Sequence, residues 1–268
     1  MPSAKRRSRK PTPRGYSAPA LEKGIDIIEL LADAESGLTV SEISERLKRS
    51  MSELFRIIVV MERRGWLQRN EDSARYSIAY HLLRLAHRGT PAHTLTAAAA
   101  PVMHDLSTRI NQSCHLVVRS GTQGLVILRQ ENQDRHANLS VRLGAAIELL
   151  SSCSGKVLLA NLGDTERELL EQSWSRAQTA AYSKLARPLE KIRKQGFAIQ
   201  RSTITAGVTD MSHPVRGFDG TVVAALTIPY LHALDGSLPK SLEQTRRLLE
   251  ESAHRVSQSL GWARAGGR

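Results

Sequence analysis

Two helix-start signals lie close together in this 268-residue chain, and they constrain its fold more than any other feature. Thr39 with Glu42, and Ser50 with Glu53, have the spacing of a capping box, in which the side chains of the cap and of the third helical residue bond each other's backbone. Only a very short turn separates the end of the first predicted helix from Ser50. Two helices joined in this way predict a helix-turn-helix unit.

The segments on either side extend this unit into a small domain. A helix is expected over residues 20–34, because apolar residues recur there at helical spacing. Gly65 supplies a stop for the last helix of the unit. The runs 66–69 and 75–78 then flank a polar turn, which is typical of a hairpin. This order predicts a winged helix-turn-helix DNA-binding domain over residues 19–78.

The second helix of the unit has one apolar face, and its opposite face is free to contact a partner. In a helix-turn-helix this helix lies in the major groove, and its N-terminus favours a nearby phosphate. We therefore expect DNA contacts from seven residues of the turn, the helix and the hairpin: Arg49, Ser50, Ser52, Phe55, Arg56, Arg69 and Arg75. Similar helices and hairpins occur in dimerisation modules and RNA-binding proteins, and the pattern alone leaves those alternatives open.

The net charge of +12 does not by itself identify a DNA-binding domain, because it is unevenly distributed. Residues 1–18 hold six basic and no acidic residues, and their Pro- and Ser-rich composition predicts a disordered tail. Residues 21–90 hold 11 basic and 11 acidic residues. The tail is either an arm that contacts phosphates or a solubilising extension. DNA binding by the folded domain must come from the arrangement of its charges.

A linker is expected over residues 79–93, with an amphipathic linker helix over 79–89 that ends at the break Gly89-Thr90-Pro91. Its apolar residues should be buried against the first domain or against a second copy, and the second case predicts a homo-oligomer: Leu82, Leu83, Leu85 and Ala86. Residues 94–268 alternate strand-like and helical runs, which indicates an α+β domain. The expected strands are 114–120, 124–130, 138–143, 197–200, 207–215 and 221–228. The expected helices are 95–109, 152–162, 165–172, 187–195 and 239–262, the first of them kinked at Pro101.

The sequence shows no set of residues for catalysis and no cluster for a metal, so neither an enzyme nor a cofactor is expected. The two cysteines, Cys114 and Cys153, are far apart and lack metal-ligand spacing, which favours a reducing cytoplasm. No apolar run is long enough to span a bilayer. A sheet packed against helices without catalytic residues favours a small-molecule sensor. The alternatives are a small-molecule enzyme using the C-terminal domain and an RNA-binding adaptor.

Several segments together resemble the IclR-type family of bacterial transcription regulators. They include "LEKGIDIIELLA", "LTVSEISERL" and "RSMSELFRIIVVMERRGWLQR" in the first domain, and "SCSGKVLLA", "GVTDMSHPV" and "DGTVVAALTI" in the second. The resemblance covers about residues 20–262. It implies an α+β protein with a winged helix-turn-helix, a linker helix and a C-terminal ligand-binding domain similar to the GAF fold. It also implies a double-stranded DNA operator, a small organic or aromatic acid as effector, dimers or tetramers, and no cofactor or metal.

The resemblance also places the effector site. Matched residue by residue, the family's pocket falls at Leu139, Ile147, Cys153, Val208, Asp210, Thr227 and Pro229. Ser152 joins them because the free N–H groups at the predicted helix start favour an anion.

This chain departs from the family pattern in the recognition helix and in the effector pocket. In the pocket, the family's small Ser-x-Ser-Gly-Pro strand end is here Thr227-Ile228-Pro229-Tyr230. Met51 and Glu53 stand where the recognition helix commonly has lysine and threonine, whereas Ser52 and Arg56 match. Asp210 stands where members usually have an uncharged residue. A buried carboxylate without a partner is costly, so Asp210 is expected to pair with an arginine (142 or 201), to stay near water, or to await a ligand donor.

Overall fold

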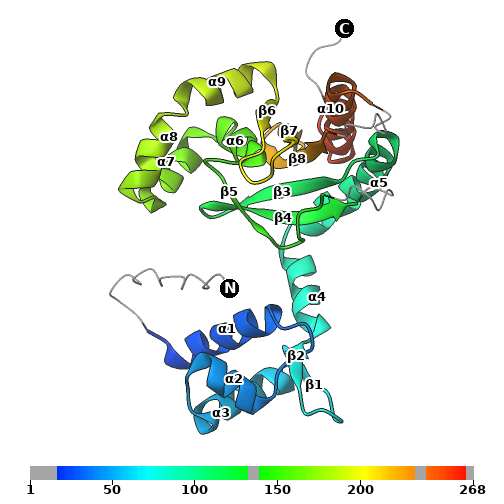
Figure 1. Cartoon of the computed structure of the whole chain (residues 1–268). Helices are drawn as coiled ribbons and strands as arrows, with labels where there is room; N and C mark the ends of the chain where they lie inside the picture. The colour runs from blue at the N-terminus through cyan, green and yellow to red at the C-terminus, as the bar shows by residue number, and fades with distance from the viewer. Residues whose placement is uncertain (1–16, 132–138, 233–239, 264–268) are drawn as a thin grey trace. The chain divides into compact units, whose positions relative to one another are not determined.

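The computed structural model describes residues 17–131, 139–232 and 240–263, and the chain forms two compact units, Met1–Thr90 and Pro91–Arg268. The N-terminal unit contains helices and a two-stranded hairpin, and the C-terminal unit contains a six-stranded sheet with helices (Figure 1). The α+β fold class expected from the sequence is confirmed. The basic tail expected at residues 1–18 lies outside the described residues, except for Ser17 and Ala18.

Three helices and a hairpin make up most of the N-terminal unit, and a fourth helix follows. In chain order they are α1 (Pro19–Ala32), α2 (Val40–Leu47), α3 (Met51–Arg63), β1 (Leu67–Arg69), β2 (Tyr76–Ile78) and α4 (Tyr80–Gly89). Ile27, Ile43 and Leu54 meet in its core and are fully buried, as their helical spacing predicts. β1 and β2 pair antiparallel, with Leu67 opposite Ile78. This is the winged helix-turn-helix predicted from the sequence.

One of the two predicted capping boxes is present and the other is not. The backbone N–H of Glu42 donates to Thr39 Oγ1 at 3.3 Å, and Thr39 N–H donates to Glu42 Oε2 at 2.7 Å. Ser50 does occupy the cap position of α3, but its side chain makes no capping bond. The prediction for Ser50 and Glu53 is therefore wrong, because the Glu53 carboxylate forms an ion pair with Lys23 of α1 instead.

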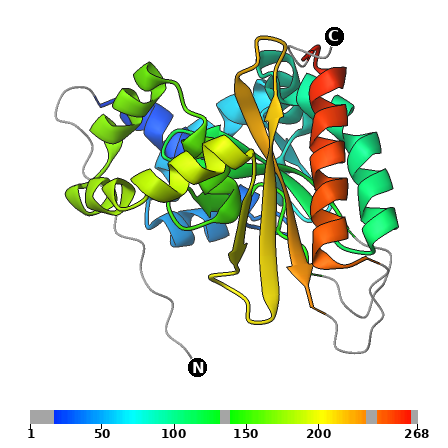
Figure 2. The same cartoon turned by 90° about the horizontal axis from the view of Figure 1, so that it is seen from above.

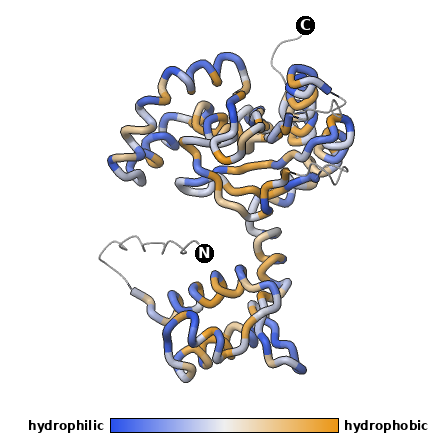
Figure 3. The backbone as a smooth tube through the Cα atoms, viewed as in Figure 1, coloured by the Kyte–Doolittle hydropathy of each residue, from blue (hydrophilic) through white to orange (hydrophobic). Residues whose placement is uncertain are grey.

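Six antiparallel strands form the sheet of the C-terminal unit, in the order β5-β4-β3-β8-β7-β6. The strands are β3 (Cys114–Ser120), β4 (Gln123–Gln130), β5 (Ala146–Glu148), β6 (Ala198–Arg201), β7 (Val208–Arg216) and β8 (Val222–Leu231). β7 and β8 are the longest of them and pair over nearly their whole length, with a register shift between Val215 and Arg216. The strands carry hydrophobic runs that Figure 3 shows along the sheet.

Helices cover this sheet on both faces. On one face, α5 (Ala92–Ile110) and α10 (Leu242–Ser259) lie side by side and share a core with Met211 and Val215 of β7 (Figure 2). On the other face, α6 (Cys153–Ala160) packs over Ala198 and Ala225, and α7 (Asp164–Ser173), α8 (Arg176–Ser183) and α9 (Ala186–Gln195) surround it. Because side chains alternate along a strand, β7 presents different residues to the two helix layers.

Two elements differ from the prediction. The strand expected at 138–143 is wrong for its described part: residues 139–145 are not strand, and pairing with β4 begins only after a turn at Gly144, whose φ of +77° suits glycine. α8 was not predicted, because none of its residues is buried and it therefore has no apolar periodicity. Its start nevertheless has a capping box between Ser175 and Gln178.

Candidate DNA-binding surface and effector site

The α3 helix presents a buried face and an exposed face, as the sequence predicts. Leu54 and Ile58 are buried in the core, whereas Ser52, Phe55 and Arg56 are exposed on the other side. No carboxylate among the described residues forms an ion pair with Arg56. A guanidinium that is exposed and unpaired can bond a phosphate or the major-groove edge of guanine.

The negative charge that Glu53 brings to the start of α3 is neutralised within the unit. Lys23 of α1 forms an ion pair with it and, through that hydrogen bond, lowers the pKa of the Glu53 carboxyl. Arg49 lies in the turn before α3, half-buried, with Nη2 3.7 Å from Asp26 Oδ2 of α1. Ser50 is exposed beside it, with its Oγ 3.4 Å from that of Ser52. The N-terminal end of α3 is thus held by α1 without a net negative charge.

The two arginines of the hairpin have different surroundings. Arg69, at the end of β1, is exposed, and no carboxylate of the described residues pairs with it. Arg75 donates from Nη1 to Glu42 Oε2 and from Nη2 to Glu42 Oε1, both at 3.0 Å, and Nη1 also donates to the Gly37 carbonyl at 2.8 Å. Both nitrogens at the end of the Arg75 guanidinium are therefore hydrogen-bonded inside the unit. The guanidinium of Arg69 is available for a partner.

The predicted effector residues Cys153 and Asp210 lie next to each other. Cys153 begins α6, is buried, and its Sγ donates to the carbonyl oxygens of Asp210 and Ala198, each at 3.4 Å. Burial raises the pKa of the Cys153 thiol above its usual range, so it is a poor nucleophile. Ser152 caps α6 by accepting from Gly155 N–H at 3.0 Å. The N-terminus of α6 therefore faces the backbone of β6 and β7.

The Asp210 carboxyl has no cation partner among the described residues. It forms no ion pair with Arg142 or Arg201, and the hydroxyl that bonds it belongs to Ser202. Burial raises the pKa of Asp210, while the Ser202 hydrogen bond acts in the opposite direction. The sequence left three surroundings open for Asp210: an arginine partner, water, or a ligand donor. The first of these, the arginine partner, is wrong. A half-buried carboxyl beside a single hydroxyl retains acceptor capacity for a ligand or for water.

The remaining effector candidates are distributed unevenly over the sheet. Pro229 is opposite Asp210, and Thr227 Oγ1 lies 2.9 Å from Ser212 Oγ in the buried β7–β8 pair. Val208, also buried, begins β7. Ile147 belongs to β5, which lies toward the other edge of the sheet but packs on the same apolar cluster as Cys153. Leu139 lies outside the strands and is half-buried.

One polar pair beside these residues has no signature in the sequence. Gln200 of β6 lies opposite Asp210 in the strand register. It accepts from Lys156 Nζ at 2.6 Å and donates to the Ser151 carbonyl at 2.9 Å. Lys156 thereby brings a positive charge toward the start of α6. No spacing along the chain could have indicated this, because the pairing of β6 with β7 brings these residues together.

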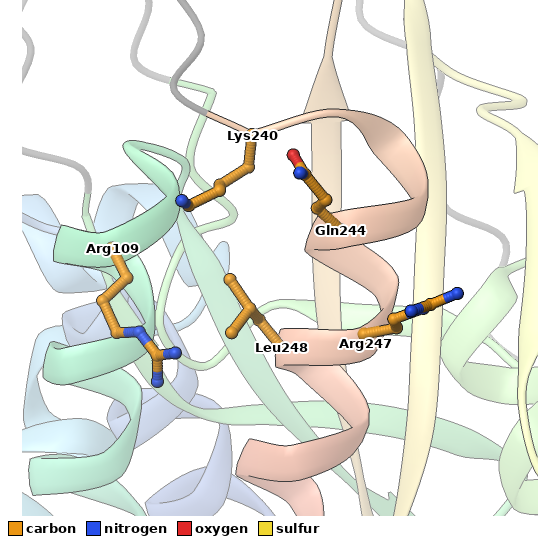
Figure 4. A pocket seen from close by; sticks show the side chains of 5 residues that line it. All are labelled: Arg109, Lys240, Gln244, Arg247 and Leu248. Atoms are coloured by element: carbon orange, nitrogen blue, oxygen red, sulfur yellow. The ribbon is translucent and has the colours of Figure 1, made fainter.

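Three hollows of the described part of the chain are lined by other residues than these. One of about 410 Å³ lies between α5 and α10, where Figure 4 shows Arg109, Lys240 and Leu248 turned toward it and Arg247 pointing away. A second of about 330 Å³ lies among α6, α7, α8 and α9 and is lined by Leu159 and Tyr182. None of the predicted effector residues lines either hollow. Within the described residues, no helix could span a membrane and no group of side chains could hold a metal.

The arrangement of a winged helix-turn-helix with a helix-flanked antiparallel sheet agrees with two family models. The IclR helix-turn-helix domain matches residues 20–71, and the C-terminal domain of the bacterial transcriptional regulator IclR matches residues 88–258. The chain belongs to the IclR family. Members of the IclR family are DNA-binding transcription regulators with an effector-binding C-terminal domain and not enzymes, so the enzyme alternative and the RNA-binding alternative are set aside.

Individual IclR-family proteins match over most of the chain. The HTH-type transcriptional regulator XynR of Escherichia coli (strain K12) is 25% identical over 91% of this chain and 97% of its own length. The HTH-type transcriptional repressor AllR of Salmonella typhi is 25% identical over 79% of both.

Solved structures of IclR proteins agree with the fold. The IclR homologue from Microbacterium hydrocarbonoxydans, solved in complex with 4-hydroxybenzoate, is 25% identical, covers 90% of this chain and 98% of its own, and has a TM-score of 0.74. The Thermotoga maritima IclR is 26% identical, with coverage of 90% and 98% and a TM-score of 0.67.

Proposed function

We propose that this protein binds a DNA operator and that a small organic or aromatic acid in its C-terminal unit changes the affinity of that binding. The observation that carries the proposal is the exposed face of α3, where Arg56 has no carboxylate partner in the part of the chain described. An IclR-family relative in complex with 4-hydroxybenzoate supports an aromatic acid as the effector. The protein would act in the cytoplasm, where bacterial DNA lies.

On the DNA side, we assign base contacts to Ser52, Phe55 and Arg56, which share the exposed face of α3. Arg49 and Ser50 precede the helix and would contact the phosphate backbone, because a helix N-terminus favours a nearby phosphate. Arg69 would reach the backbone or the minor groove from the hairpin. Arg75 would act mainly by positioning the hairpin, because its guanidinium is already bonded to Glu42.

On the effector side, we place the acid between the start of α6 and the strands β7 and β8. The carboxylate would approach Ser152 and the N–H groups at the start of α6, with Lys156 nearby. A hydroxyl or amine on the same molecule would donate to Asp210, whose carboxyl lacks a cation partner within the described residues. Leu139, Ile147, Cys153, Val208, Thr227 and Pro229 would supply the apolar and hydroxyl lining.

A homo-oligomer follows from the exposed apolar residues of the α4 helix. Leu83 is 54% exposed and Leu85 is 40% exposed. Leucines this exposed on a short helix leave apolar surface, which we assign to contact with a second copy. A two-fold dimer would then bind a pseudo-palindromic operator, with a tetramer as the larger alternative.

The test is a titration of the full chain with the DNA fragment that precedes its own gene, followed by fluorescence anisotropy at several salt concentrations. We expect a steep decrease of affinity with salt and at least about a thousandfold preference over random DNA. Adding 4-hydroxybenzoate should change the affinity. Equal affinity for random DNA would remove the operator part of the proposal, and indifference to 4-hydroxybenzoate and to other aromatic acids would remove the effector part.

A further inference from the structure

A third hollow lies beside the end of β7, beyond its pairing with β6. Its volume is about 300 Å³, at the lower end of the range of small-molecule pockets. It lies between the C-terminal end of α9, the strand β7 and the helix α10. The residues that matter for its chemistry are Lys194, His213, Arg216, Glu250, His254 and Trp262.

The alternation of side chains along β7 separates this hollow from the effector site. Met211 and Val215 pack into the core that α5 and α10 share, and His213 lies between them on the same side of the strand. Ser212 points the other way, since its register partner Ala198 packs with Cys153. Asp210 is on the Ser212 side. A molecule in the hollow would therefore touch neither Asp210 nor Cys153.

The imidazole of His213 has an unused polar atom at this hollow. The residue is only 5% exposed, and its Nε2 has no hydrogen-bond partner within the described part of the chain. One face of the ring stacks on Phe197 at 5.4 Å. Burial lowers the pKa of His213 to about 4, so the ring is neutral near pH 7. An unsatisfied buried nitrogen costs free energy, and a ligand that bonds it would recover that cost.

Arg216 supplies a positive charge that the described residues do not neutralise. It is half-buried, its Nη1 donates to the Gly220 carbonyl at 2.9 Å, and its Nη2 reaches Asn161 Oδ1 at 3.4 Å. Its guanidinium lies 6.0 Å from the centre of the Trp262 ring. No described carboxylate pairs with it. A guanidinium in such a place is suited to a carboxylate, which it can bond through two parallel N–H groups.

The one acidic residue in the lining is already matched. Glu250 Oε2 accepts from Arg246 Nη1 at 3.0 Å. Lys194 is likewise paired with Glu190 at 2.6 Å. The uncompensated charge at the hollow is therefore that of Arg216, which lies beside the indole of Trp262. The rings of His254 and Trp262 meet edge to face, with their centres 4.8 Å apart. Aromatic walls beside a guanidinium favour an organic anion over a bare inorganic one.

We propose that this hollow is a second small-molecule site, for a small organic carboxylate whose acidic group bonds Arg216 and whose other polar group bonds His213 Nε2. It is independent of the effector site proposed above, because none of the residues assigned to that site lines the hollow. The register shift between Val215 and Arg216 helps to build it, since the Arg216 N–H bonds Ser257 Oγ of α10 at 2.9 Å and thereby fixes the residue beside that helix.

The test uses the full chain labelled with 5-fluorotryptophan, in which Trp66, Trp174 and Trp262 each give one fluorine resonance. The probes are acetate and benzoate, with sodium chloride at equal ionic strength as the reference. We expect a saturable shift of the Trp262 resonance with at least one of the two acids and none with chloride. Trp66 serves as the internal control, because it belongs to the N-terminal unit.

Variants separate this site from the effector site. Arg216→Gln should weaken the response of Trp262 about tenfold or more, because a charge-assisted pair is lost. His213→Phe should weaken it by a smaller factor, and Asp210→Asn should leave it unchanged. Circular dichroism checks that each variant is folded, and if Arg216→Gln is not, His213→Phe decides alone. No saturable shift with either acid, or a shift that both folded variants retain, would overturn the proposal.

Discussion

Arg75 of the hairpin and Glu42 of α2 face each other through two parallel hydrogen bonds, each of 3.0 Å. The same Glu42 also completes the capping box with Thr39, so one carboxylate connects the helix start to the wing. The hydrogen bond from the Thr39 backbone contributes most to lowering the pKa of Glu42, and the hydrogen bonding and charge of Arg75 add to it. The wing is thus oriented relative to α2 by a contact that no local pattern contains.

This pair gives a prediction for the wing. Arg75→Ala should lower the melting temperature of the N-terminal unit, and Glu42→Gln should lower it similarly, because each leaves the other partner unpaired. If Arg75 only positions the wing, its removal should leave the salt dependence of DNA binding unchanged. Arg69→Ala should instead reduce the slope of log affinity against log salt by about one. Thermal unfolding measures the melting temperatures, and anisotropy titrations measure the salt dependence. A reduced slope for Arg75→Ala would show that Arg75 contacts a phosphate.

Arg56→Ala should weaken operator binding without unfolding the protein, since the side chain is exposed. If Arg56 bonds phosphate, the loss should be similar for all sequences, with the slope reduced by about one. If it bonds guanine, one operator position should lose its preference, at a cost of about 1–3 kcal/mol. Arg176→Ala, an exposed arginine of α8, removes the same charge and is the control. If a folded Arg56→Ala protein binds the operator with the affinity of the parent, Arg56 contacts neither phosphate nor guanine.

The exposed leucines of α4 should decide the oligomeric state. Replacing Leu83 and Leu85 together by serine should shift the protein to the monomer in light scattering at micromolar concentration, because the surface that a second copy would cover becomes polar. Leu169→Ser on α7 changes an equally exposed leucine and should have no such effect. A parent that is already monomeric with and without DNA is the result that contradicts the assignment.

Asp210→Asn should weaken the response of operator binding to 4-hydroxybenzoate about tenfold, which corresponds to losing one charge-assisted hydrogen bond. Operator affinity without the acid should stay as in the parent, because Asp210 is in the C-terminal unit. Asp164→Asn, at an exposed position of α7, is the matched control. If Asp210→Asn responds like the parent, the carboxyl does not contact the effector and only the site at the start of α6 remains.

The stability of the C-terminal unit should decrease in mild acid because of His115. Burial lowers the pKa of this histidine from 6.5 to about 4, so the unfolded chain binds a proton in this interval that the folded chain does not. The stabilisation is complete above pH 6.5 and is lost as the pH falls toward 4, by on the order of 3 kcal/mol. Denaturant unfolding of His115→Gln should show a flatter pH dependence than the parent, and His104→Gln at an exposed position should not.

The sequence determined the parts of this protein that depend on neighbours along the chain. The Thr39–Glu42 box, the buried spacing of Leu54 and Ile58, and the hairpin were predicted because caps, helical periodicity and turns involve residues a few positions apart. The resemblance to the IclR family, carried by the order of several such segments, gave the α+β architecture with its sheet domain.

The tertiary structure decided which of several possible partners each charged group takes. Ser50 and Glu53 have the same spacing as Thr39 and Glu42, yet Lys23 of α1 takes the Glu53 carboxylate. Arg75 is bonded to Glu42 rather than left free, Asp210 has Ser202 rather than an arginine, and His213 and Arg216 meet at a hollow under α10. An ion pair or a cavity depends on distances between elements remote in sequence, and only the packing of those elements sets these distances.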